Sequence, residues 1–150
     1  MVILVSIILL QGTIMGATPE SGKFGLGIQL TSPHYGLSGI YNHSEEISFQ
    51  GVIGTGYWGS IGGRILYRFE KKEFYNLYGY GALGLYTQGY SNYYFSSGFS
   101  LGAGAGIEYN WKGLSEDLPP VFTNLEAGLS SVYPHINIGV GFHYYFNISD

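Results

Sequence analysis

The chain has 150 residues, which is enough for one domain with a sizeable core. Charged residues make up only 11% of it, whereas Gly (25), Tyr (15) and Phe (9) are abundant, so few charges are available to cover a water-facing surface. A net charge of −4 with six Lys plus Arg argues against nucleic acid as a partner, and the absence of cysteine excludes disulfides and thiolate metal sites.

The N-terminal run from Val2 to Ala17 is short and apolar and ends in small residues. Only about nine of its residues are continuously apolar, too few for the roughly 20 of a membrane-spanning helix, so residues 1–17 are predicted to be a secretory signal peptide. An ordinary buried N-terminal segment is the alternative. The folded domain is placed at residues 22–146, followed by a short tail at 147–150.

Beyond Ser21 the sequence alternates apolar residues with small or polar ones, and glycine recurs every few residues, which opposes long helices. This alternation predicts strands at residues 23–30, 36–41, 47–56, 61–70, 74–87, 98–111, 121–130 and 135–146. The last of them contains INIGVGFHYYF, residues 136–146, which places Ile, Val and aromatic residues on one face and Asn, Gly and His on the other. The strands at 36–41 and 74–87 leave open which of their faces is the apolar one.

The apolar faces could line the inside of a soluble barrel or face lipid. In the first case the outer surface would consist of Gly, Ser, Asn and a few charges; in the second, the glycines and charges would fill a narrow lumen. The second arrangement explains both the low charge and the glycines. Because lipid offers no partner for backbone polar groups, strands can span it only as a closed barrel. The predicted fold class is therefore all-β, a closed up-and-down antiparallel transmembrane β-barrel of about eight strands.

Two segments, SLGAGAGIEYNW and NIGVGFHYYF, resemble the small eight-stranded outer-membrane β-barrels, the group that includes the OmpA transmembrane domain, OmpX and the opacity-type surface proteins. The resemblance extends over residues 23–146. It implies the outer membrane of a Gram-negative-type bacterium, contact with outer-membrane lipids, and insertion by the barrel-assembly machinery. The assembly signal of such families lies on the last strand and is matched here by Ile138, Val140, Phe142, Tyr144 and Phe146.

Five charged residues lie on the small-residue parity of their strands: Lys23, Arg64, Arg68, Glu108 and Glu126. An eight-stranded barrel is just wide enough for side chains to fill it, so charges from different strands can meet. We predict that these five residues form a network that plugs the lumen. A gated ion path is the alternative.

The loops at the end of the barrel opposite the termini are uncharged and rich in aromatic residues. Of these loops, only residues 87–97 are long enough to form a distinct structure. An external glycan or protein ligand could contact the rim through Tyr57, Trp58, Tyr90, Tyr93 and Tyr94. The alternative is an interfacial belt of Tyr and Trp, which lipid headgroups favour.

No complete catalytic constellation, cofactor motif or metal site is apparent. His34 and His135 lie in outer loops that contain no Asp or Glu to orient an imidazole. His43, with Glu45 and Glu46, is expected to lie in a solvated turn and not to form a metal site. His143 is expected to form hydrogen bonds in the lumen.

The resulting prediction is an integral outer-membrane β-barrel with a structural or surface-interaction role, which is not a general pore. Two alternatives stay open. One is a lipid-A-modifying barrel enzyme that uses His34 or His135, and the other is a soluble ligand-binding barrel of lipocalin type with its apolar parity pointing inward.

Overall fold

The computed structural model describes residues 19–54, 58–91, 94–115, 117–132 and 135–146, and the predicted signal peptide and C-terminal tail lie outside them. None of the described residues forms a helix long and apolar enough to cross a membrane. The described residues form a short 3-10 turn, η2 (Trp111–Gly113), and the strands β1 (Phe24–Thr31), β2 (His34–Asn42), β3 (Ile47–Gly54), β4 (Trp58–Lys71), β5 (Tyr75–Ser91), β6 (Tyr94–Asn110), β7 (Val121–Ser130) and β8 (Ile136–Phe146).

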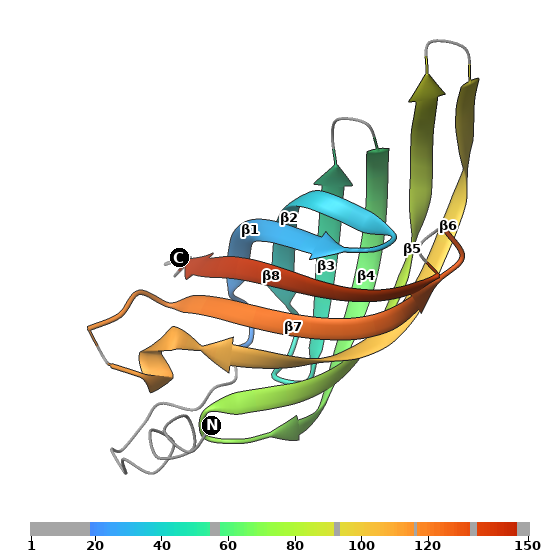
Figure 1. Cartoon of the computed structure of the whole chain (residues 1–150). Coiled ribbons are helices and arrows are strands. Elements are labelled where there is room, and N and C mark those ends of the chain that lie inside the picture. Colours follow the sequence, from blue (N-terminus) through green and yellow to red (C-terminus); the bar gives the residue numbers. More distant parts are fainter. Residues whose placement is uncertain (1–18, 55–57, 92–93, 116, 133–134, 147–150) are drawn as a thin grey trace, which may run out of the picture.

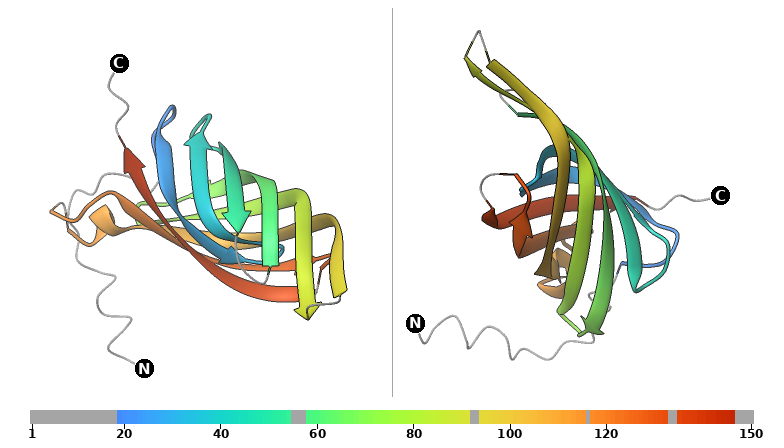
Figure 2. Two further views of the ribbon diagram at one scale, coloured as in Figure 1. Left: turned by 90° about the horizontal axis from the view of Figure 1, so that it is seen from above. Right: turned by 90° about the vertical axis from the view of Figure 1, so that its right-hand side faces the viewer.

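The eight strands form one closed barrel in which each strand is antiparallel to the next along the chain (Figures 1 and 2). The ring closes between the first and last strands, where Phe24 pairs with Phe146 and Leu30 with Val140. Closure gives the edges of β1 and β8 a partner. The predicted eight-stranded up-and-down barrel is confirmed.

The β5–β6 hairpin is much longer than expected. Each of its strands has 17 residues, and their pairing continues from Tyr75 opposite Tyr109 to Ser91 opposite Tyr94. The hairpin projects beyond its neighbours at one end of the barrel (Figures 1 and 2). The segment 87–97, expected to be a loop, is therefore mostly strand, because the antiparallel ladder persists after the neighbouring strands have ended.

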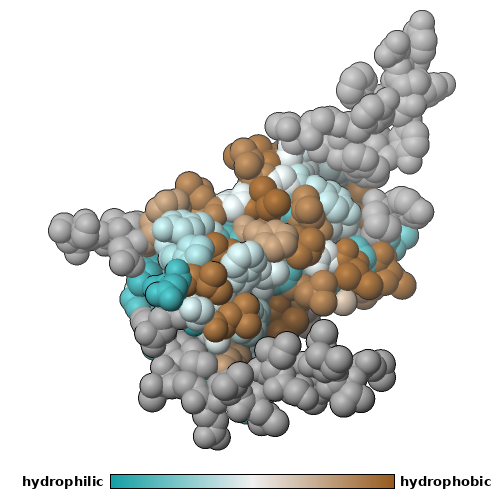
Figure 3. Space-filling view, turned by 60° about the vertical axis from the view of Figure 1, so that its left-hand side comes forward, coloured by the Kyte–Doolittle hydropathy of each residue, from teal (hydrophilic) through white to brown (hydrophobic). Residues whose placement is uncertain are grey.

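Apolar side chains point outward and polar side chains inward. Phe99, Ile136 and Ile138 are among the most exposed large hydrophobic residues, and Figure 3 shows apolar residues gathered on the outer surface. The interior holds Gln29, Asn76 and many other buried polar groups. This distribution is the reverse of that in a water-soluble domain.

The two strands of uncertain orientation follow the same rule. Tyr78 and Tyr80 are buried in the lumen, whereas Leu83 on the same strand points outward. On β2, Ser38 is buried and Leu37 is exposed. Tyr78 points inward because its hydroxyl group needs a polar partner, which it finds in Glu126, and the inward Tyr80 places its ring against the Arg64 guanidinium.

Inward-facing glycines make room for these large side chains. A Cβ atom on Gly106 would lie 2.7 Å from the Tyr78 ring and 2.9 Å from the backbone oxygen of Leu125. A Cβ on Gly128 would overlap the Tyr80 hydroxyl. The outward-facing Gly63 is different, since a Cβ there would meet no atom within 4 Å.

We therefore expect Gly106→Ala to lower the free energy of unfolding by about 1–3 kcal/mol, because the added methyl group overpacks the lumen against Tyr78 and the β7 backbone. Gly63→Ala is the matched control and should leave the stability unchanged or raise it by roughly 0.5–1 kcal/mol. Urea unfolding of the refolded protein in detergent micelles, followed by aromatic fluorescence, measures both values. Equal losses in the two variants would contradict this account of the inward glycines.

Candidate functional site in the barrel lumen

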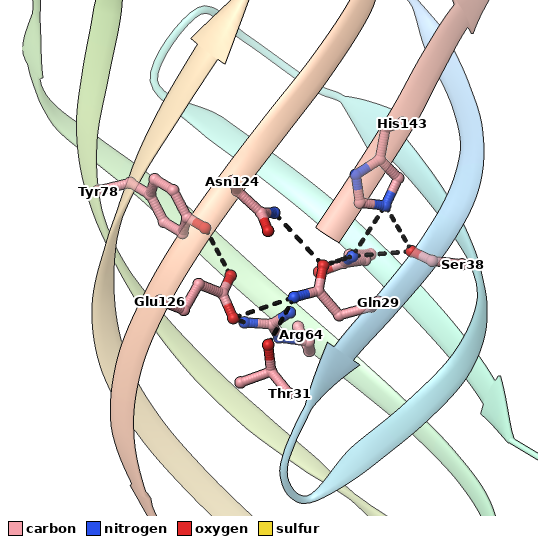
Figure 4. Close-up of polar contacts among 9 residues, drawn as sticks. Gln29, Thr31, Ser38, Arg64, Tyr78, Asn124, Glu126 and His143 are labelled. Atoms are coloured by element: carbon pink, nitrogen blue, oxygen red, sulfur yellow. Dashed lines mark hydrogen bonds and ion pairs between the residues drawn. The ribbon is translucent and has the colours of Figure 1, made fainter. Parts of the chain in front are cut away.

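Glu126 of β7 is the centre of a buried hydrogen-bond network at mid-lumen (Figure 4). Arg64 Nη2 donates to its Oε2 atom at 2.7 Å, and Tyr78 donates its hydroxyl hydrogen to Oε1 at 2.5 Å. Gln29 Nε2 donates to Oε2 at 3.1 Å. One carboxylate thus receives donors from β1, β4 and β5, which replace the water that a buried charge has lost.

Arg64 has a second partner besides the carboxylate. The centre of its guanidinium group lies 4.1 Å from the centre of the Tyr80 ring. A guanidinium over an aromatic face is stabilised by the ring quadrupole, and more strongly when water is excluded. Arg64 is therefore fixed by an ion pair and by a cation–π contact at once.

Uncharged polar side chains continue this network toward β2, β3 and β8 (Figure 4). Gln29 Oε1 accepts hydrogen bonds from Gln50 Nε2 at 3.2 Å and from Asn124 Nδ2 at 3.3 Å. Ser38 Oγ accepts from Gln50 Nε2 at 2.7 Å and lies 2.8 Å from His143 Nε2. His143 is thus part of the lumen network, in the role expected of it.

A second ion pair lies in the lumen between β4 and β6. Arg68 donates to both carboxylate oxygens of Glu108, through Nε at 2.8 Å and Nη2 at 3.3 Å. Its Nη1 atom donates to Ser48 Oγ at 2.7 Å, and Asn76 Nδ2 donates to Glu108 Oε2 at 3.1 Å. This fork geometry matches guanidinium to carboxylate, and all four residues are buried.

Of the five predicted lumen charges, the structure brings four together as two cross-lumen pairs: Arg64 with Glu126, and Arg68 with Glu108. Lys23 does not join them. It precedes β1 and pairs at 2.8 Å with the exposed Glu20, which lies only three positions earlier in the chain. The sequence interpretation missed Gln29, Tyr78 and Asn76. Gln29 shares the small-residue parity of β1, whereas Asn76 and Tyr78 lie on β5, a strand without charged residues whose faces the sequence left open.

His34 and Ser100 form the contact that most resembles an enzyme site. His34 Nε2 lies 2.8 Å from Ser100 Oγ, so the serine partner is Ser100 and not the neighbouring Ser32. Both residues are fully buried, and His34 Nδ1 has no hydrogen-bond partner among the described residues. A lipid ester could reach neither side chain in this conformation. No group of three metal-binding side chains occurs in the described part of the chain.

Two sets of predicted residues remain, the assembly signal on β8 and the aromatic rim. On β8, Ile138, Phe142, Tyr144 and Phe146 point outward and are exposed, and Val140 shares their parity with partial exposure. Of the aromatic rim, Tyr57 and Tyr93 lie outside the described residues, as do the side chains of Trp58, Tyr90 and Tyr94. The rim and the assembly signal stay predictions.

No protein-family model and no curated protein sequence matches the chain. Among solved structures, the chain is similar to the N-terminal β-barrel domain of Pseudomonas aeruginosa OprF. The TM-score is 0.58 at 14% sequence identity, and the match covers 88% of this chain and 100% of that domain. The likeness confirms the fold, a closed eight-stranded barrel, and the resemblance to small barrels of this type.

We expect Glu108→Ala to reduce the free energy of unfolding by about 3–5 kcal/mol, because it leaves the buried Arg68 without a counter-charge. Glu45→Ala is the matched control: Glu45 pairs with Lys71 at 3.0 Å on the surface, where water screens the interaction, so its loss should barely shift the urea midpoint. Both midpoints are measured in micelles. A Glu108→Ala midpoint equal to that of the control would show that the lumen pair contributes nothing.

Proposed function

We propose that the chain is an integral outer-membrane β-barrel protein with a closed lumen, which stabilises the membrane or presents a surface to an external partner. The orientation of the side chains carries this proposal. Leu83, Phe99 and Ile138 are exposed at the level of the strands, while Arg64, Arg68, Glu108 and Glu126 are buried. Such a surface is compatible with hydrocarbon and would associate in water.

The same orientation argues against the lipocalin-type alternative. A soluble carrier of apolar ligands needs an apolar cavity inside the barrel. Here the lumen is filled by two ion pairs and by amide, hydroxyl and imidazole groups that bond to one another. An apolar ligand entering it would have to break these bonds without replacing them.

The proposed location is the outer membrane of a Gram-negative-type bacterium. It is supported by the closed barrel, by the likeness in fold to a bacterial β-barrel domain, and by the outward aromatic parity of β8. Insertion would depend on the barrel-assembly machinery reading Ile138, Val140, Phe142, Tyr144 and Phe146. An external glycan or protein ligand at the aromatic rim is part of the same proposal.

The filled lumen supports a structural or interactive role over general diffusion. Arg64 and Glu126 join β4 to β7, and Arg68 and Glu108 join β4 to β6 across the interior. A hydrated solute would have to separate both pairs in order to pass. Separating a buried pair is costly because each charge is left without its partner.

Two leucines of nearly equal exposure distinguish a membrane barrel from a soluble one. Leu83 on β5 is 63% exposed, and Leu114, in the connection between β6 and β7, is 62% exposed. In water, an arginine at either site would be harmless. In a bilayer, we expect Leu83→Arg to cost about 2–4 kcal/mol of unfolding free energy, because it places a charge in the hydrocarbon layer.

The measurement is urea unfolding of both variants in phospholipid vesicles, with Leu114→Arg as the control that should match the parent. Unboiled samples on a detergent gel report the fraction folded, since a closed membrane barrel migrates differently from its boiled form. The proposal fails if Leu83→Arg is as stable as Leu114→Arg, or if the folded protein stays in solution without detergent or lipid.

A further inference from the structure

The turn between β1 and β2 lies inside the barrel and not beyond its end. Ser32, Pro33 and His34 are all buried, and none of the His34 side chain is exposed. Hairpin turns normally run over the surface, where water satisfies their backbone groups. A buried turn therefore needs a complementary seat in the wall.

That seat lies on the inner faces of β4, β5 and β6, which are not neighbours of β1 or β2 in the closed sheet. The His34 ring lies against Gly62 and Gly84, where any Cβ atom would overlap it. Pro33 Cδ lies 2.8 Å from the position of a Cβ on Gly102. The turn thus crosses the lumen and rests on three glycines of the opposite wall.

The turn is held much more weakly than the layers below it. Besides the packing on the three glycines, its side chains make one hydrogen bond to the opposite wall within the described residues, between His34 Nε2 and Ser100 Oγ at 2.8 Å. Glu126, in contrast, receives three donors, and Arg68 makes three hydrogen bonds. The contacts across the lumen therefore favour movement of the turn over opening of the charged layers.

Several buried polar atoms would gain partners if water entered this half of the lumen. His34 Nδ1, Ser60 Oγ, Arg64 Nη1, Tyr80 Oη and both side-chain polar atoms of Asn137 have no hydrogen-bond partner within the described residues. A buried polar group without a partner is unfavourable, and water would relieve it. Hydration of these groups would offset the loss of the hydrogen bond to Ser100 when the turn leaves its seat.

We propose that the β1–β2 turn, residues 31–34, is a movable plug seated on Gly62, Gly84 and Gly102, and that its displacement opens a polar vestibule to small water-soluble molecules. The vestibule ends at the Arg64–Glu126 pair, so opening the plug gives access without making a through-pore. The inference rests on the proposed function, because the plug has a physiological role only if this end of a membrane barrel faces the outside.

The chain contains no cysteine, so a single introduced thiol can report on access. Ala82 is buried on the inner wall and pairs in register with Gly102, against which Pro33 packs. The reporter is Ala82→Cys, and its rate of modification by a small charged thiol reagent is measured on the folded protein in micelles. Ser97→Cys, at an exposed position of β6, gives the rate for an accessible thiol.

Gly62→Ala, added to the reporter, tests the plug directly. The three atoms nearest to its new methyl group all belong to the His34 ring, so the methyl displaces the turn with little effect on the wall. Gly63→Ala is the matched control on the outer face of the same strand. We expect Gly62→Ala to speed modification of the reporter about tenfold, the shift that follows from loss of one buried hydrogen bond, and Gly63→Ala to leave the rate unchanged.

Ser100→Ala is a second test, which removes the hydrogen bond without adding bulk and decides the matter if Gly62→Ala does not fold. It should also raise the rate of reporter modification. The plug is refuted if the reporter Ala82→Cys in the otherwise unchanged protein reacts as fast as Ser97→Cys. It is also refuted if Ser100→Ala, and Gly62→Ala where it folds, give the same reporter modification rate as Gly63→Ala.

The unboiled gel band of each sample shows whether the barrel has folded, and flotation with vesicles shows whether it has inserted. A folded, inserted variant with an unchanged rate refutes the plug alone, whereas failure of the parent protein to insert refutes the proposed function.

Discussion

The ion pairs across the lumen are the interactions on which the rest of the barrel depends. Arg64 and Glu126 lie on β4 and β7, with two strands between them along the wall, yet their side chains meet at 2.7 Å. They can meet only if the sheet curves round and closes. Because a buried charge without its partner costs about 3–5 kcal/mol, closure of the ring and pairing of the charges stabilise each other.

The space for the large lumen side chains of β5 comes from glycines on the two strands that follow it in the sheet, β6 and β7. Tyr78 and Tyr80 can extend over the inner faces of these strands because Gly106 and Gly128 present no side chain where the tyrosine rings lie. The abundance of glycine and of tyrosine in the sequence thus has one common cause, the filling of a narrow interior. A glycine on the outer face such as Gly63 does not take part in this fit, since it faces open space.

Much of the barrel could be predicted from the chain, because side chains along a strand point alternately to its two faces. A strand with one buried and one exposed face therefore shows a sequence pattern with a period of two residues. That period predicted the strand number, the orientation of β8 and the four charges of the lumen. It could not orient β5, since Tyr78 is apolar in its ring and polar at its hydroxyl, and only the position of Glu126 decides between the two faces. Nor could it place the turn at His34, because the seat of this turn comes from strands distant in sequence.

Lys23 shows a related limit. Its parity matched the lumen, but parity gives the direction of a side chain and not its height along the barrel axis. Lys23 lies at the end of the wall, where its amine pairs with Glu20.

The buried charges of the lumen also help to specify the fold, and this role is separate from any contribution they make to the stability of the barrel. Replacing a buried ion pair with well-packed apolar residues is often neutral or stabilising, so stability is a weak reason to keep Arg64 and Glu126. In a barrel with an apolar exterior, however, an apolar interior would make the two faces of each strand equivalent. A slip of one residue would then go uncorrected, whereas here it would turn Arg64 or Glu126 onto the apolar exterior. The polar interior thus fixes which face of each strand points outward and, through the paired strands, the register of the whole sheet.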